Sequence, residues 1–232
     1  MRTLGLIGGM SFESSAIYYR LINEGVRRRL GALHSAEMVL HSVDFQPIAE
    51  LQRAERWKDA GAKLAQAAKG LEAAGAECVL ICANTMHLVA DAVESAVRIP
   101  VIHIIDETAK RLKDAGCRRP LLLATRYTME HGFYTGRMER QGIDVLVPAA
   151  EDRVTLHAII YEELCVGKIL NGSRTTLMGM IERAKDAGAD SVIFGCTEIG
   201  LILDPTELPL PGFDTALIHC EAAVDFALSG QQ

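Results

Sequence analysis

Short apolar runs alternate along the chain with longer stretches in which apolar residues recur every three or four positions. The first pattern is typical of buried strands and the second of amphipathic helices, and their alternation predicts an α/β fold with mostly parallel strands. Helices are expected at 12–30, where Gly31 ends the pattern, and at 57–71. The predicted strands are 4–8, 38–41, 78–82, 101–104, 121–124, 145–147, 191–194 and 210–213.

The second half of the chain repeats the organisation of the first. Gly9 and Ala83 each follow an apolar strand and lie 74 residues apart, and Thr125 and Cys196 do the same at 71 residues. Any α/β chain has strands at comparable intervals, so this spacing alone leaves a duplication open. Two proline-led segments, 99–108 and 208–215, favour it because each carries an acidic residue and a threonine near its end.

Two similar halves would place their strand-to-helix turns on either side of a cleft. Sheets of this kind bind ligands at the carboxyl ends of their strands. We expect a first lobe of residues 1–98 plus 208–232 and a second lobe of residues 99–207, with the active site between them.

Charge and hydropathy exclude several classes of function. The chain has 24 basic and 30 acidic residues, a formal net charge of −6, and no like-charge block longer than Arg27 to Arg29. This composition argues against a nucleic-acid or polyphosphate-binding protein. No apolar run approaches the roughly 18 residues of a membrane span, and the N-terminus lacks the apolar core of a signal peptide. A cytoplasmic location is expected.

One of the six cysteines stands out. No Cys-x-x-Cys pair and no zinc-type spacing occurs, so free thiols in a reducing compartment are expected, most of them buried. Cys196 follows a strand and precedes a helix, a position that lowers the pKa of a thiol. Asn84, Thr85 and Thr197 add side-chain donors at two such turns, where a carboxylate substrate can bind.

Acid/base groups facing each other across a carboxylate-bearing carbon suit racemisation, in which a proton leaves one face and another arrives at the opposite face. The anion would be stabilised by N–H groups and hydroxyls, so no pyridoxal lysine is needed. Gly8 and Gly9 fit a tight turn and lack the spacing of a dinucleotide or phosphate loop. His41 and His103 lie in apolar strands and are interpreted as core histidines.

Three motifs resemble the aspartate/glutamate racemase family: the run from Gly5 to Ser14, the Asn84-Thr85-Met86-His87 segment, and Gly195-Cys196-Thr197-Glu198-Ile199. The resemblance implies two pseudo-symmetric three-layer α/β/α lobes, cofactor-independent chemistry on an acidic amino acid, and a homodimer. It makes Cys196 the second-lobe acid/base. It implies substrate-binding roles for Met10, Gln52, Asn84, Thr85, Thr125, Thr197 and Glu198, with no metal ion.

The sequence departs from this family at Ala83, where most members carry cysteine and a similar subgroup carries threonine. Alanine cannot transfer a proton. An engineered inactivating substitution, a natural one-base enzyme and a protein that binds without racemising all fit. A one-cysteine decarboxylase resembling arylmalonate decarboxylase is the second enzyme candidate, and a small-carboxylate binding protein is the third hypothesis. Arg53 could meet a side-chain carboxylate, although an exposed helix arginine is the simpler interpretation.

Overall fold

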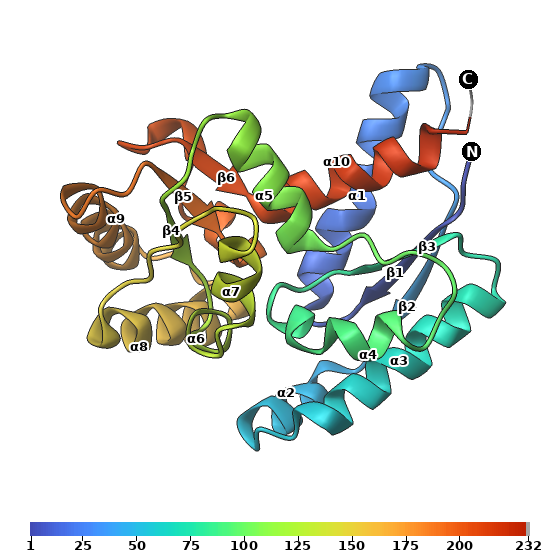
Figure 1. Cartoon of the computed structure of the whole chain (residues 1–232), viewed down its shortest axis with the longest axis horizontal. Coiled ribbons are helices and arrows are strands. Elements are labelled where there is room, and N and C mark those ends of the chain that lie inside the picture. The colour runs from blue at the N-terminus through green and yellow to red at the C-terminus, as the bar shows by residue number, and fades with distance from the viewer. Residues whose placement is uncertain (231–232) are drawn as a thin grey trace. The chain divides into compact units, whose positions relative to one another are not determined.

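The computed structural model describes residues 1–230 and divides the chain into two compact units, each with its own parallel three-stranded sheet (Figure 1). The first unit is Met1–Ile104 with the residues from His219 onward, and the second is Ile105–Ile218. The second unit therefore begins at residue 105 rather than 99 and ends at residue 218 rather than 207. Its end extends further because the last strand, at 212–214, pairs with the second sheet.

The first unit alternates strands and helices as the apolar pattern predicts. Its sheet has the order β2-β1-β3 with all neighbours parallel. Its elements are β1 (Leu4–Gly8), α1 (Phe12–Leu30), β2 (Met38–Ser42), α2 (Phe45–Arg53), α3 (Trp57–Ala73), β3 (Cys78–Ile81), the 3₁₀ helix η1 (Thr85–Val89) and α4 (Ala90–Glu94), with the end of α10 (Thr215–Leu228).

Helices cover both faces of the first sheet. Neighbouring strand residues point to opposite faces, so Gly5 and Gly8 of β1 face opposite ways. A Cβ added to Gly5 would lie 3.3 Å from Leu71 of α3, whereas one added to Gly8 would lie 2.6 Å from Ser15 of α1. Helix α3 therefore lies on one face and α1 on the other, which gives the expected three layers (Figure 1).

The second unit is built in the same way around a sheet of order β4-β5-β6, again all parallel. Helices α9 and α5 lie on the two sides of this sheet (Figure 1). Its elements are α5 (Ile104–Asp114, from its second residue), β4 (Pro120–Leu123), α6 (Arg126–Glu130), α7 (Phe133–Glu139), α8 (Ala150–Ala158), the π-helical turn η2 (Ile159–Glu163), the 3₁₀ helices η3 (Leu164–Val166), η4 (Thr197–Leu201) and η5 (Pro205–Glu207), α9 (Asn171–Asp186), β5 (Ser191–Phe194), β6 (Gly212–Asp214) and the start of α10.

The strand register confirms the repeat. In the first sheet Ile7 pairs with Ile81, and in the second Leu123 pairs with Phe194. These are the intervals of 74 and 71 residues that relate Gly9 to Ala83 and Thr125 to Cys196. The two turns in each half thus leave neighbouring strands at the same level, and positions 83 and 196 are topologically equivalent.

Two of the predicted strands are wrong in extent. Of the segment 101–104, only Val101 bridges to Val79, and Ile104 already begins α5. Of the segment 145–147, only Leu146 bridges to Leu121. Prolines at positions 100 and 148 border these segments, and a residue without an N–H cannot extend a ladder of hydrogen bonds.

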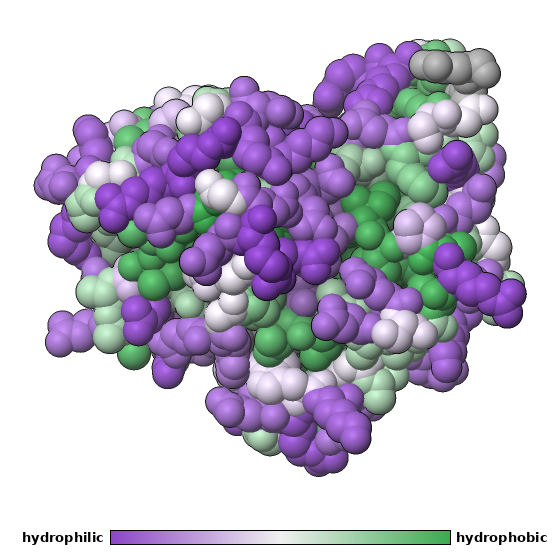
Figure 2. All heavy atoms as spheres, viewed as in Figure 1, coloured by the Kyte–Doolittle hydropathy of each residue, from purple (hydrophilic) through white to green (hydrophobic). Residues whose placement is uncertain are grey.

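Polar side chains cover much of the face shown in Figure 2, with apolar side chains between them. Large apolar side chains with substantial exposure include Phe12 (71%) and Tyr19 (56%), seven positions apart on α1 and so on one helix face. The homodimer stays a prediction. No helix within residues 1–230 combines the length and apolar composition needed to span a bilayer.

Candidate active site

In the second unit, the register brings Thr125 and Cys196 together at the carboxyl edge of the sheet. The Gly195 N–H donates to the Leu123 carbonyl at 2.8 Å, which holds the strand ends side by side. Thr125 is buried and N-caps α6, its hydroxyl oxygen accepting from the Thr128 N–H at 3.3 Å. The sequence therefore placed Thr125 correctly at the start of the second-half turn.

The Cys196 thiol donates to a carboxylate. Its Sγ lies 2.9 Å from Oε2 of Glu198, and the Thr197 hydroxyl donates to the same oxygen at 2.7 Å. Glu198 is buried, so this oxygen is the centre of a compact thiol, hydroxyl and carboxylate cluster. The structure brings together the three predicted residues of this motif and shows that Glu198 holds the other two.

The environment of Cys196 raises the pKa of its thiol well above the ordinary value. Burial is the main cause, and the negative charge of Glu198 and the nearby Cys165 add to it. The expected lowering by a helix N-terminus is wrong. The helix that follows is the five-residue η4, whose dipole is small, and a carboxylate beside the thiol disfavours the thiolate.

Two residues near Cys196 were missed in the sequence. Tyr161 belongs to the π-helical turn η2, and Cys165 belongs to η3, which follows it. Burial raises the pKa of Tyr161, and the charges of Cys196, Cys165 and Glu198 raise it further. The ring of His157 packs on Tyr161 with centroids 4.6 Å apart. A π-helical turn at a candidate site is a recurring feature, but no pattern of apolar residues reveals it.

In the first unit, the turn after β1 depends on the absence of a side chain at Gly9. Gly9 has φ of +90°, and a Cβ there would lie 2.1 Å from the carbonyl oxygen of Val43. The Gly9 N–H donates to the Ser15 hydroxyl at 2.7 Å, and that hydroxyl donates to the Ser11 carbonyl at 3.0 Å. The tight-turn interpretation is confirmed for Gly9, whereas Gly8 is the last residue of β1.

The turn after β3 carries Ala83, Asn84 and Thr85. Asn84 and Thr85 are both buried polar residues, and Ala83 packs against the core of the unit. The parallel pairing of β1 with β3 places this turn beside the turn at Gly9. The expected helix after this turn is only the five-residue η1, so side chains rather than a strong helix dipole offer the donors here.

Met10 and Gln52 are brought to the same region. Met10 belongs to the core cluster that also includes Met86, and the buried Gln52 amide donates to the Met86 sulfur at 3.1 Å. Arg53 is exposed and donates to the Ala49 carbonyl of its own helix, as the simpler interpretation of that residue expects.

Comparisons with known proteins identify the family of this chain. The Asp/Glu/Hydantoin racemase family matches residues 7–223. The chain belongs to this family. A putative Asp/Glu racemase from Yersinia pestis is 48% identical, with 98% of this chain and 100% of that chain covered and a TM-score of 0.92.

Two further relatives extend the comparison. An aspartate racemase homologue from Pyrococcus horikoshii OT3 is 35% identical, covering 98% and 99% of the two chains with a TM-score of 0.86. The broad specificity amino-acid racemase RacX of Bacillus subtilis is 20% identical over 98% of this chain and 99% of its own. The racemase fold of two α/β lobes is therefore shown for this member of the family.

Outside the two turns, the remaining cysteines behave largely as expected. Cys78, Cys82, Cys117 and Cys220 are buried, and within residues 1–230 only Cys165 and Cys196 are partly exposed. Burial raises the pKa of the Cys82 thiol. Within the described part of the chain, no cluster of three His, Cys, Asp or Glu side chains could hold a metal ion.

Of the two histidines interpreted as core residues, one is buried and the other is exposed. His103 is buried, with its ring 4.6 Å from that of His87. His41 is exposed, so its interpretation as a core histidine is wrong. It lies on β2, which pairs only with β1 among the described strands and therefore leaves one edge open.

His219 makes a testable contribution to stability in acid. Its Nδ1 accepts from the Tyr18 hydroxyl at 2.8 Å and its Nε2 donates to the Ile102 carbonyl at 2.7 Å. Burial lowers the pKa of this imidazole to about 4. Above about pH 6.5 both the folded and the unfolded state carry a neutral ring. Between pH 6.5 and 4 only the unfolded state gains a proton. The free energy of unfolding therefore decreases as the pH is lowered through this range, by about 3 kcal/mol from this residue.

Urea unfolding between pH 7 and pH 4 checks this prediction. His219→Gln keeps a donor for Ile102 and cannot titrate, so its unfolding free energy is expected to fall less over the same range. Equal pH dependence in the two proteins would contradict the assignment.

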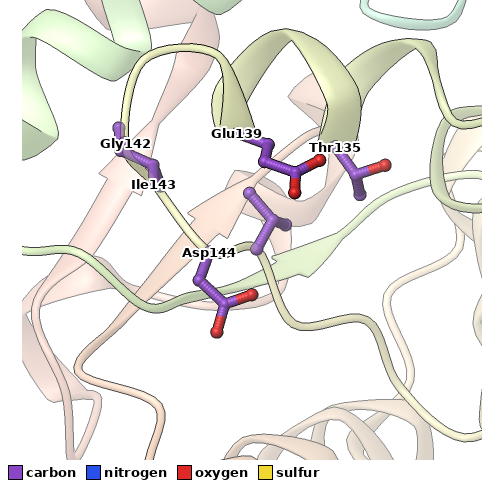
Figure 3. Close-up of a pocket in the computed structure, with 6 residues that line it drawn as sticks. Thr135, Glu139, Gly142, Ile143 and Asp144 are labelled. Carbon is purple, nitrogen blue, oxygen red and sulfur yellow. The ribbon is translucent and has the colours of Figure 1, made fainter.

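A separate pocket of about 400 Å³ lies elsewhere in the second unit (Figure 3). It is lined by Thr135 and Glu139 of α7 and by residues 142–145. Asp144 donates through its N–H to the Arg118 carbonyl ahead of β4, and its carboxylate pairs with Arg119 at 3.1 Å. The pocket is therefore at the amino ends of the strands, at the opposite edge from Thr125 and Cys196.

Proposed function

We propose that this protein acts on the Cα of a small acidic amino acid with Cys196 as its acid/base group. The observation that carries the proposal is the 2.9 Å contact of the Cys196 thiol with Glu198 at the end of β5. It occurs in a chain that belongs to a racemase family. The chemistry proposed is proton removal and return at Cα without a cofactor.

Glu198 gives the thiol its basic character. A carboxylate that disfavours the thiolate makes it scarce at neutral pH but a stronger base once formed, which suits removal of a weakly acidic Cα proton. The thiol proton is lost to solvent when this thiolate forms. In the absence of substrate, the Thr197 hydroxyl donates to the same oxygen of Glu198.

The first unit supplies substrate contacts and no base. We propose that Asn84 and Thr85 bind the α-carboxylate, that Thr125 and Thr197 contact it from the second half, and that Met10 and Gln52 enclose the substrate. Two-base racemisation needs one acid/base group for each face of Cα, and positions 83 and 196 are the equivalent positions of the two halves. In this mechanism the base at position 83 is missing, because alanine cannot transfer a proton.

The preferred substrate is proposed to be aspartate or glutamate. The name of the Yersinia relative refers to both amino acids, that of the Pyrococcus relative refers to aspartate, and that of the Bacillus relative refers to a broader range.

Ala83 also favours a second candidate, a protein that binds a small carboxylate without racemising it. A one-cysteine decarboxylase is a related alternative, because loss of carbon dioxide creates the carbanion without a base and one proton donor then suffices. Binding with no exchange of the α-proton would favour the binding protein. Release of carbon dioxide from an arylmalonate would favour the decarboxylase.

Thermal unfolding with L-aspartate, L-glutamate or malate tests the carboxylate site. A ligand at 100 times its Kd adds about 2.7 kcal/mol, which corresponds to a shift of roughly 5 to 10 °C for a chain of this size. Sodium chloride at matched ionic strength is the control. A melting temperature unmoved by tens of millimolar of all three ligands would overturn the proposed function.

A further inference from the structure

His87 is a buried histidine whose two ring nitrogens both have identified backbone contacts. Its Nδ1 lies 2.9 Å from the carbonyl oxygen of Ala83, and the Ile104 N–H donates to its Nε2 at 3.3 Å. A nitrogen that accepts from a backbone N–H carries no proton of its own. The ring is therefore neutral, with its proton on Nδ1, and it donates that proton to Ala83.

The packing around His87 keeps the ring in this orientation. The ring of His103 meets it edge to face with centroids 4.6 Å apart, and that of His219 lies 5.9 Å away. His219 is in turn fixed by Tyr18 and by the Ile102 carbonyl. A ring held in this way cannot rotate without disturbing several buried groups.

We infer that His87 is a positioning residue for the active-site turn after β3, which carries Ala83, Asn84 and Thr85. By holding the Ala83 carbonyl, it sets the direction of the peptide between Ala83 and Asn84, and with it the direction of the side chain at position 83 and of the Asn84 N–H. This inference rests on the proposed function, because it assigns His87 to the turn that would bind the α-carboxylate. His87 itself touches no reacting atom.

The same ring also has a structural role at the first residue of α5. The Ile104 N–H is one of the donors that a helix leaves without a partner in its own first turn, and Nε2 of His87 accepts from it. A substitution that removes both contacts, such as His87→Leu, would therefore not separate the two roles.

Two conservative variants separate them. In His87→Asn the amide nitrogen occupies the place of Nδ1, so the contact with Ala83 is kept and that with Ile104 is lost. In His87→Gln the amide reaches the place of Nε2, so the contact with Ile104 is kept and that with Ala83 is lost. Each variant loses one hydrogen bond, and similar melting temperatures are expected. His41→Gln, on the exposed edge strand, is the surface control.

Titration with L-aspartate, followed by tryptophan fluorescence or calorimetry, measures the effect. His87→Gln is expected to raise Kd by about three- to tenfold, the equivalent of one lost hydrogen bond, and His87→Asn to raise it less. In the Ala83→Thr background, the racemisation rate should follow the same order. ¹⁵N NMR of the imidazole should find the proton on Nδ1.

The outcomes are distinct. A parent protein that binds no aspartate overturns the proposed function and with it the role of His87. If the unmodified protein binds aspartate and His87→Gln and His87→Asn have the same Kd, the positioning role alone is overturned. A proton found on Nε2 contradicts the inferred contact itself.

Discussion

Replacement of Ala83 by threonine or cysteine is expected to raise the rate of amino-acid racemisation by about 10² to 10⁴, the range typical of a general acid/base group. The backbone at this position is already fixed, since the Ala83 N–H donates to the Ile81 carbonyl and its own carbonyl accepts from His87. A hydroxyl or thiol would therefore occupy a defined place at the end of β3, equivalent to that of Cys196 at the end of β5.

Ala83→Val is the matched control, because valine has the shape of threonine and no exchangeable proton. Chiral chromatography of L- and D-aspartate after incubation measures the rate. The two-base proposal predicts that Thr and Cys gain activity, that Val does not, and that Cys196→Ala abolishes the gain. Equal rates for Thr and Val would show that position 83 affects packing and not proton transfer.

The pattern of apolar residues was sufficient to predict the strands at whose ends the candidate site residues lie. The apolar strands before Ala83 and Cys196 are buried in the middle of their units, where burial on both faces leaves an uninterrupted apolar run. Because pairing in such strands advances residue by residue, the intervals of 74 and 71 along the chain became the register of the two sheets. The equivalence of positions 83 and 196 could thus be predicted from the sequence alone.

Tertiary packing decided what the sequence could not. Tyr161 and Cys165 approach Cys196 only because a π-helical turn and a 3₁₀ turn bring them there, and neither turn has a period that apolar residues mark. The segments 101–104 and 145–147 are apolar enough for strands, but each makes a single bridge. The apolar pattern indicates that a segment is buried, but it does not indicate how many backbone hydrogen bonds the neighbouring strand can still form.

The direction of the Cys196 pKa shift shows a further limit. A position before a helix suggested a lowered pKa, whereas burial and the carboxylate two residues later raise it. Glu198 was visible in the sequence as part of the motif. Its effect depended on a side-chain direction that only the structure gives, with the thiol and carboxylate 2.9 Å apart.

A single competent base should make exchange of the α-proton specific to one enantiomer. In the proposed mechanism the Cys196 thiolate reaches the proton of only one enantiomer, because the other enantiomer carries its proton on the opposite face of Cα. In deuterated water the reactive enantiomer is expected to gain α-deuterium with retention, since Cys196 returns a solvent-derived deuteron to the face that it deprotonated. Inversion should be slower by a large factor, because it needs a water molecule beside Ala83 that no side chain orients.

Proton NMR of L- and D-aspartate and of L- and D-glutamate, each incubated separately, measures this exchange directly. Cys196→Ala is expected to stop it, and Ala83→Thr should extend it to the second enantiomer while allowing net racemisation. Because the pKa of the Cys196 thiol is raised, the exchange rate of the unmodified protein should still be rising with pH at pH 9. Equal exchange of both enantiomers in the unmodified protein, or exchange that persists without Cys196, would be incompatible with a one-base site and would require another group to move the proton.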